Sequence, residues 1–126
     1  MSRHTDLLRE IAAAINSQGA YRIADWFTED FRLYEPSEPD WPNGHAGASR
    51  LLEKFRPLDP PVNLEMLDII EEGDRVAVRW QLSAMYNGVP VRRAMLAIYR
   101  FEDGRIAEDW GIPFRGDWPV IEAQHR

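Results

Sequence analysis

The sequence predicts an α+β fold, in which helices come first along the chain and a curved, mainly antiparallel sheet follows. Residues 5–17 repeat apolar side chains at helical spacing. After Pro61 the chain instead alternates apolar and polar residues, in runs separated by the strong hairpin signals Asn87-Gly88 and Asp103-Gly104. Helices followed by a run of strands are typical of a sheet with helices on one face. We therefore expect a cone-shaped barrel, with three N-terminal helices on the concave face of the sheet.

The N-terminal half is predicted to contain these three helices and one short strand. Gly19 ends the first helix, and Pro57 ends the third because the residue before a proline avoids the helical conformation. A loop rich in proline and glycine, with Trp41 and His45, separates the strand from the third helix. The expected elements are helices over 5–17 and 20–27, a strand over 31–35, and a helix from about 48 to 56.

The C-terminal half is predicted to form four antiparallel strands, over 62–71, 75–86, 90–101 and 106–112. In the second of them Val76, Val78, Trp80 and Leu82 share one face, which predicts the buried side of the sheet. Residues 113–126 show little periodicity, and we expect a partly disordered tail there. The chain is thus interpreted as a single domain over 1–126, with its core at about 5–112.

Composition limits the classes of function. The 126 residues include 44% hydrophobic and 29% charged residues, which is typical of a soluble globular protein. Five Trp, five Phe and four Tyr are many for this length, and they indicate a deep core, a lined pocket or both. The net charge of −6 argues against binding to nucleic acid or to an anionic membrane surface.

Several chemistries and locations are not expected. The chain has no cysteine, which excludes disulfides, thiolate catalysis and cysteine-bound zinc. Its three histidines do not form a His-x-x-x-His pair, so we expect no metal, and no other cofactor is indicated. The N-terminus lacks a long apolar run, and a cytoplasmic location is the resulting expectation.

Asp109 is the leading candidate for chemistry. If the hairpin at Asp103-Gly104 has a three-residue loop, Tyr99 lies opposite Asp109 on the pocket side of the sheet. A carboxyl group desolvated by aromatic rings has a raised pKa and can act as a general base near neutral pH. The Tyr99 hydroxyl could then hold a developing oxyanion. The alternative is a surface ion pair between Asp109 and Arg93 or Arg100.

Four further residues are candidates for ligand binding. Arg93 shares its strand face with Met95, and it could bind a substrate carboxylate or pair with Asp109; the alternative is an arginine at the surface or in a dimer interface. Tyr34 could reach the pocket or lie solvated on an edge strand. Trp26 could stack on a ligand or belong to the core.

Four motifs, taken in order, resemble the SnoaL-like polyketide cyclases of the nuclear-transport-factor-2-like superfamily. They are residues 26–31 (WFTEDF), 47–55 (GASRLLEKF), 72–80 (EGDRVAVRW) and 99–110 (YRFEDGRIAEDW). The resemblance implies an α+β barrel with a buried pocket, and often a homodimer. The cyclases carry a His-x-Asp motif around the tryptophan of their last strand, and here Asp109 and Gly111 stand at its two positions. Ketosteroid isomerase, which has a similar fold, uses an aspartate and a tyrosine for enolisation.

These observations predict a pocket protein for a small apolar or aromatic molecule. It would be a cofactor-independent isomerase, cyclase or hydratase acting on an apolar carbonyl compound, with Asp109 as general base. The alternatives are a ligand-binding module without turnover and a dimeric accessory protein. We expect a homodimer packed through the outer face of the sheet, because both faces of the strands carry bulky residues and helices can cover only one.

Overall fold

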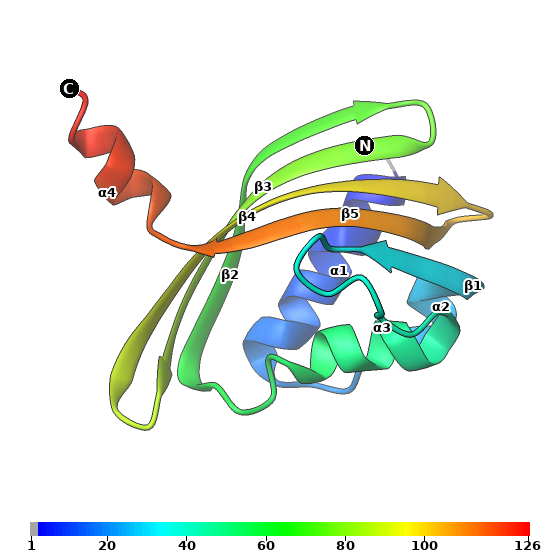
Figure 1. Ribbon diagram of the computed structural model, residues 1–126, viewed down its shortest axis with the longest axis horizontal. Helices are drawn as coiled ribbons and strands as arrows, with labels where there is room; N and C mark the ends of the chain where they lie inside the picture. Colours follow the sequence, from blue (N-terminus) through cyan, green and yellow to red (C-terminus); the bar gives the residue numbers. More distant parts are fainter. Residues whose placement is uncertain (1–2) are drawn as a thin grey trace.

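The computed structural model describes residues 3–126, and it places a bent five-stranded sheet over three helices (Figure 1). The strand order is β1-β5-β4-β3-β2, with β1 and β5 parallel and the other neighbours antiparallel. The elements are α1 (Arg3–Ser17), α2 (Ile23–Trp26), β1 (Phe27–Tyr34), α3 (Gly44–Glu53), β2 (Asp59–Glu72), β3 (Arg75–Tyr86), β4 (Val89–Glu102), β5 (Arg105–Arg115) and α4 (Trp118–Ala123).

The predicted α+β fold class is confirmed. The sheet is mainly antiparallel, and helices α1, α2 and α3 lie on its concave side (Figure 1). Strands β1 and β2 are the two edges of the described sheet and do not pair with each other. The sheet is therefore an open cone rather than a closed barrel.

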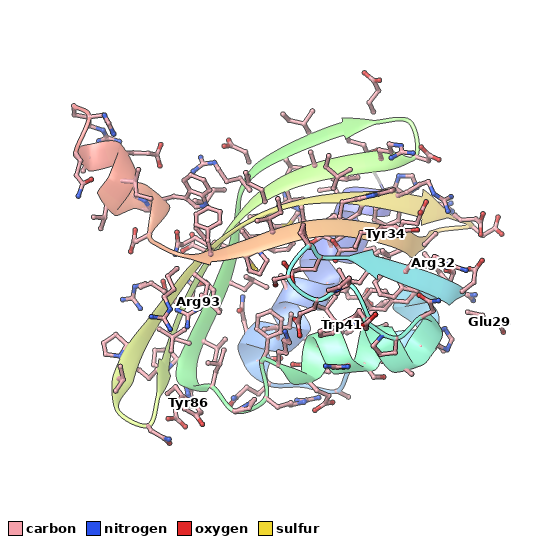
Figure 2. All side chains as sticks on the ribbon, viewed as in Figure 1. Glu29, Arg32, Tyr34, Trp41, Tyr86 and Arg93 are labelled. Carbon is pink, nitrogen blue, oxygen red and sulfur yellow. The ribbon has the colours of Figure 1, made fainter. Side chains whose placement is uncertain are left out.

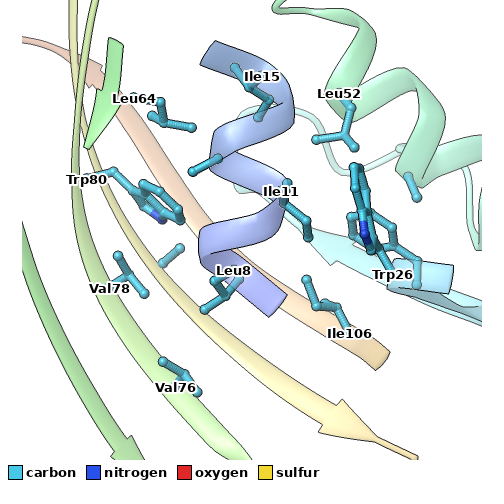
Figure 3. Close-up of a cluster of buried hydrophobic side chains, with 14 of the residues drawn as sticks. Leu8, Ile11, Ile15, Trp26, Leu52, Leu64, Val76, Val78, Trp80 and Ile106 are labelled. Carbon is cyan, nitrogen blue, oxygen red and sulfur yellow. The ribbon is translucent and has the colours of Figure 1, made fainter. Parts of the chain in front are cut away.

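The core lies between α1 and the inner face of the sheet (Figure 3). Helix α1 buries Leu8, Ile11 and Ile15, which recur at the spacing of one helix face. The inner face of β3 buries the four residues that alternation predicted, which are Val76, Val78, Trp80 and Leu82. Period-2 alternation thus identified correctly which side of β3 faces the helices.

The hairpin between β4 and β5 differs from the expected three-residue loop. It is a two-residue turn, with φ of 51° at Asp103 and 77° at Gly104, the positive values that this tight turn requires. Further along, the register shifts between Arg100 and Phe101, which leaves Ala107 as an extra residue in β5. This bulge restores the predicted pairing of Tyr99 with Asp109.

Several N-terminal boundaries also differ from those expected. Strand β1 begins at Phe27 rather than at residue 31, because parallel pairing with β5 extends the backbone directly after α2. Helix α3 begins at Gly44 rather than near residue 48. These boundaries depend on tertiary pairing and loop packing, which periodicity does not report.

The expectation of a partly disordered tail over 113–126 is wrong. Strand β5 continues to Arg115, and α4 follows with the Asp117 side chain accepting a hydrogen bond from Val120 N at 3.1 Å. The buried Gln81 side chain fastens this segment to the sheet: its Nε2 donates to Gly116 O at 3.1 Å and its Oε1 accepts from Trp118 N at 2.7 Å. An Asp followed two residues later by Pro was the local signal for this helix.

Two kinds of feature are absent from residues 3–126. No helix there has the length and apolar character needed to cross a membrane. No group of three or more potential metal-binding side chains gathers within the same range.

Candidate functional site

An apolar cavity of about 180 Å³ lies between the concave side of the sheet and the helices. Its walls are mainly aliphatic and aromatic, and they include side chains of α1, α3, β3, β4 and β5. Glu35, Glu38 and Lys54 are its charged lining residues at the surface, and they mark where the cavity opens. Such a cavity, with few polar groups, is the usual form of a small-molecule site.

Asp109 places an ionisable group in this apolar cavity. It lies on the inner face of β5 and is only 5% exposed. Its Oδ1 has no hydrogen-bond partner among residues 3–126. Burial raises the pKa of Asp109 from an ordinary value of 3.8 to about 7, because the ionised carboxylate has lost its hydration. Near neutral pH both the acid and the carboxylate are therefore populated.

Gly111 keeps space beside this carboxyl group. It lies two residues after Asp109 on the same strand face, and it also lines the cavity. A Cβ atom at this position would lie 3.2 Å from Asp109 Oδ1, which is closer than ordinary packing allows. Glycine here therefore avoids a close contact between a side chain and Oδ1.

Tyr99 supplies the second polar group of the cavity. It lies opposite Asp109 in the register of β4 and β5, and its hydroxyl oxygen accepts a hydrogen bond from Trp80 Nε1 at 2.9 Å. Burial raises the pKa of Tyr99 well above its ordinary value, and the nearby Asp109 raises it further. The phenol therefore stays protonated, and its O–H can donate to a bound ligand while its oxygen accepts from Trp80.

The loop after β1 closes one side of the cavity. Trp41 is buried in this loop beside α3 (Figure 2), and its Nε1 donates to Gly47 O at 3.0 Å. Lys54 Nζ lies 4.7 Å from the Trp41 ring and forms an ion pair with Glu38 at 3.0 Å. The proline- and glycine-rich loop is thus tied to α3 at its tryptophan and at the opening of the cavity.

The structure brings three of the six predicted site residues together at the cavity, namely Asp109, Tyr99 and Met95. Arg93 shares their strand face but lies six residues before Tyr99, about 20 Å along the strand. Its Nη1 donates to Arg92 O at 2.9 Å, and the side chain lies near the far end of β4 (Figure 2). The structure therefore does not pair Arg93 with Asp109.

The other two candidates also lie away from the cavity. Trp26 is buried in the core, where its Nε1 donates to Glu10 Oε2 at 2.6 Å. Tyr34 lies on the outer face of the sheet, where its ring stacks on Trp110 and its hydroxyl donates to Glu108 Oε2 at 2.8 Å. Parallel pairing of β1 with β5 gives Tyr34 the same face as Trp110.

Sequence reasoning did not identify the roles of Trp80 and Gly111 in this site. Trp80 was interpreted only as a residue of the buried face, although a buried indole N–H normally finds a hydrogen-bond acceptor. Its place on the inner face, near the predicted position of Tyr99, was the available signal. Gly111 was seen only as the loss of a cyclase aspartate, whereas in the structure its missing side chain avoids a close contact with Asp109 Oδ1.

The outer face of the sheet carries a second hollow, of about 810 Å³. Four exposed aliphatic side chains line it, and we call them the outer apolar patch: Ile70, Leu96, Ile98 and Ile112. Ile98 is 45% exposed and Ile112 is 55% exposed. Contiguous apolar surface of this kind is typical of a contact with another molecule.

Comparisons with known proteins agree with this architecture. Residues 8–109 match the family described as the SnoaL-like domain. AclR from Streptomyces galilaeus, a candidate hydroxylase, is 25% identical with a TM-score of 0.74, and the match covers 98% of this chain and 87% of AclR. IdmH from Streptomyces antibioticus, a candidate polyketide cyclase, is 24% identical with a TM-score of 0.72, covering 98% of this chain and 99% of IdmH.

The fold also occurs in more distant proteins. A candidate polyketide cyclase from Acidithiobacillus ferrooxidans is 16% identical with a TM-score of 0.74, and the match covers 98% of this chain and 94% of that protein. At this identity the likeness shows a shared fold only. A search of curated protein sequences found no significant match.

Proposed function

The chain belongs to the SnoaL-like domain family, and we propose that it binds a small apolar carbonyl compound and transfers a proton at the carbon next to the carbonyl group. One observation carries this proposal: Asp109, whose Oδ1 has no hydrogen-bond partner among residues 3–126, shares an apolar cavity with the Tyr99 hydroxyl. A base and an oxyanion donor are the two groups that enolisation of a ketone requires.

In the proposed step the Asp109 carboxylate removes a proton from the α-carbon of the bound ketone. The C–H electron pair forms the C=C bond of the enolate, and the carbonyl π electrons move onto oxygen. The Tyr99 O–H donates a hydrogen bond to that oxygen while Trp80 Nε1 holds the phenol in place. Return of the proton from Asp109 to a conjugated carbon completes isomerisation. Exchange is completed when the Asp109 acid has traded its proton for a solvent deuteron and delivers that deuteron to the α-carbon. This cycle requires that both the protonated and the ionised form of Asp109 are populated, as its pKa of about 7 allows near neutral pH.

Acetophenone in deuterated water provides a direct test, because its methyl protons lie next to a carbonyl group and exchange slowly without a catalyst. We expect the protein to accelerate loss of the methyl proton signal, followed by NMR at pH 8, with saturation as the ketone concentration rises. If the protein accelerates exchange for none of a panel of single-ring ketones, the catalytic proposal is wrong. Saturable binding without exchange would instead favour a ligand-binding module.

Replacing Tyr99 with phenylalanine is expected to slow this exchange about a hundredfold, because the enolate oxygen loses its hydrogen-bond donor. The ring remains, so the shape of the cavity is nearly unchanged. Loss of the acceptor for Trp80 Nε1 should also lower the free energy of unfolding by about 1–3 kcal/mol. Tyr86→Phe, at the exposed hairpin between β3 and β4, is the matched control and should change neither quantity.

We also propose that two copies of the chain pack through the outer apolar patch. Its exposed aliphatic side chains support this arrangement, because monomeric proteins seldom expose so much contiguous apolar surface. Leu96 and Ile112 of this patch also line the cavity, so the proposed dimer interface would lie next to the site. Such a dimer is compatible with catalysis and with the alternative of an accessory protein.

Replacing Ile98 with glutamate should convert this dimer to a monomer, because a buried unpaired carboxylate at the interface is costly. Sedimentation or light scattering should give twice the 14.6 kDa chain mass for the wild-type protein and the single mass for the variant. Tyr86→Glu, at an equally exposed position outside the patch, should remain dimeric. A wild-type protein that sediments at the single chain mass at micromolar concentration would contradict the proposal.

A further inference from the structure

We infer that the cavity selects carbonyl compounds with one six-membered ring, or two small fused rings, and excludes compounds with three or more fused rings. The inference rests on the proposed function and names the substrate class of the same site.

The volume of the cavity sets the first limit on the size of the ligand. At about 180 Å³ it is close to an apolar protein cavity of roughly 150 Å³ that binds benzene. It lies below the range of about 300–1,000 Å³ that holds larger ligands. A single ring with its carbonyl group and a short substituent therefore fills it.

Hydrogen bonds fix the largest side chains of the wall. Trp80 is held through Nε1 by Tyr99, and Trp41 is held through Nε1 by Gly47 O. Neither indole can move aside without losing a buried hydrogen bond, which costs about 1–3 kcal/mol. Expanding a close-packed wall to admit a larger ligand costs a similar amount or more. The cavity is thus expected to keep its size when a ligand binds.

Met95 is the wall residue on which the upper limit of ligand size should depend most directly. It lies on the inner face of β4 opposite Trp80, it lines the cavity, and it is only partly buried. Its unbranched side chain makes no hydrogen bond that the fold requires, and truncation to alanine removes the γ-, δ- and ε-atoms from the wall. Met66 offers a matched control, because it also pairs with Trp80 from the inner face and is partly buried, but does not line the cavity.

The polarity of the walls narrows the class further. Asp109 and Tyr99 are the polar side chains deep in the cavity, and the charged lining residues Glu35, Glu38 and Lys54 stand at the opening. A ligand carbonyl oxygen can pair with the Tyr99 hydroxyl, whereas a second buried acceptor would find no donor beside the ionised Asp109 carboxylate. A ligand carboxylate would also be repelled by Asp109 in its ionised form. The favoured ligand is therefore a neutral compound with one carbonyl group and an otherwise apolar ring.

Three ketones of increasing size test the inference: acetophenone with one ring, 1-tetralone with two fused rings and anthrone with three. Binding is measured by two-dimensional NMR, following the backbone amide signal of Gly111 beside the carboxyl group. We expect acetophenone and 1-tetralone to bind with similar affinity and anthrone to bind at least about tenfold more weakly. Met95→Ala should strengthen anthrone binding about fivefold or more, and Met66→Ala should leave it unchanged.

The outcomes separate the two proposals. If anthrone binds the wild-type protein as tightly as acetophenone, the size limit is wrong and the proposed enolisation can still stand. Circular dichroism checks that Met95→Ala is folded. If the folded variant does not gain affinity for anthrone, Leu51→Ala, which shortens a side chain of the α3 wall, is tested next. If neither variant gains affinity for anthrone, the inference that these wall residues limit the size of the ligand is wrong. If none of the ketones binds, both the proposed function and the size limit fall.

Discussion

Replacing Asp109 with asparagine is expected to slow α-proton exchange about 10²- to 10⁴-fold and to leave the fold intact. The amide has the shape of the carboxyl group but cannot accept the proton. The wild-type rate should itself rise as the pH increases from 5 to 8 and then level off, because only the ionised form is a base and the pKa of Asp109 is about 7. Asparagine should remove this pH dependence together with the activity.

The exchange assay with acetophenone measures both effects. Asp30→Asn, on the exposed face of β1, is the matched control and should exchange at the wild-type rate. Binding of acetophenone to the Asp109→Asn protein should weaken by less than about threefold, since the apolar walls are unchanged. An Asp109→Asn protein that retains the wild-type rate would show that another group is the base.

The same substitution should stabilise the protein above neutral pH, by up to about 4 kcal/mol. The pKa of Asp109 is about 7 in the folded protein and near 3.8 for an exposed aspartate, so between these values the folded state binds a proton that the unfolded state does not. Wild-type stability therefore falls as the pH rises from about 4 to 7, and the loss is complete above pH 7. Asparagine does not ionise, and it avoids this loss.

Urea unfolding of the wild-type and Asp109→Asn proteins at pH 4, 6 and 8 measures the difference in their free energies of unfolding. The contributions of the other ionisable groups cancel in this difference. The gain in the free energy of unfolding should be small at pH 4 and largest at pH 8. A carboxylate held by cationic or hydrogen-bonding partners would produce the opposite result, with the variant losing stability as the pH rises. A difference that is constant with pH would show that the Asp109 carboxyl group stays hydrated in the folded protein.

The fold could be predicted largely from local sequence patterns. Alternation identified β3 and its buried face, and the turn residues located two hairpins. The pairing of Tyr99 with Asp109 was predicted correctly from an incorrect loop, because a two-residue turn followed by a one-residue bulge has the same net register as a three-residue loop. The parallel pairing of β1 with β5 joins segments about 75 residues apart, and no local pattern reports it.

The candidate site could be predicted only in part, for related reasons. The period of two along a strand placed Asp109, Tyr99 and Met95 on one face, and all three line the cavity. The same rule placed Arg93 on that face but does not indicate where along the strand the cavity ends. The face on which Tyr34 lies depends on how the edge strand β1 pairs with β5. The loop that supplies Trp41 and Glu38 to the cavity has no periodicity from which their positions could be predicted.

The extra residue in β5 also sets which side chains of that strand face the helices. Without it, Glu108 would face Tyr99, and Asp109 would move to the opposite side of the sheet. Trp110 would then point inward in place of Gly111, and an indole would occupy the space beside the phenol. The native hairpin instead keeps Glu108 outside, where it bonds to Arg100 and Tyr34. One unpaired residue thus keeps Asp109 and Gly111, rather than Glu108 and Trp110, at the cavity.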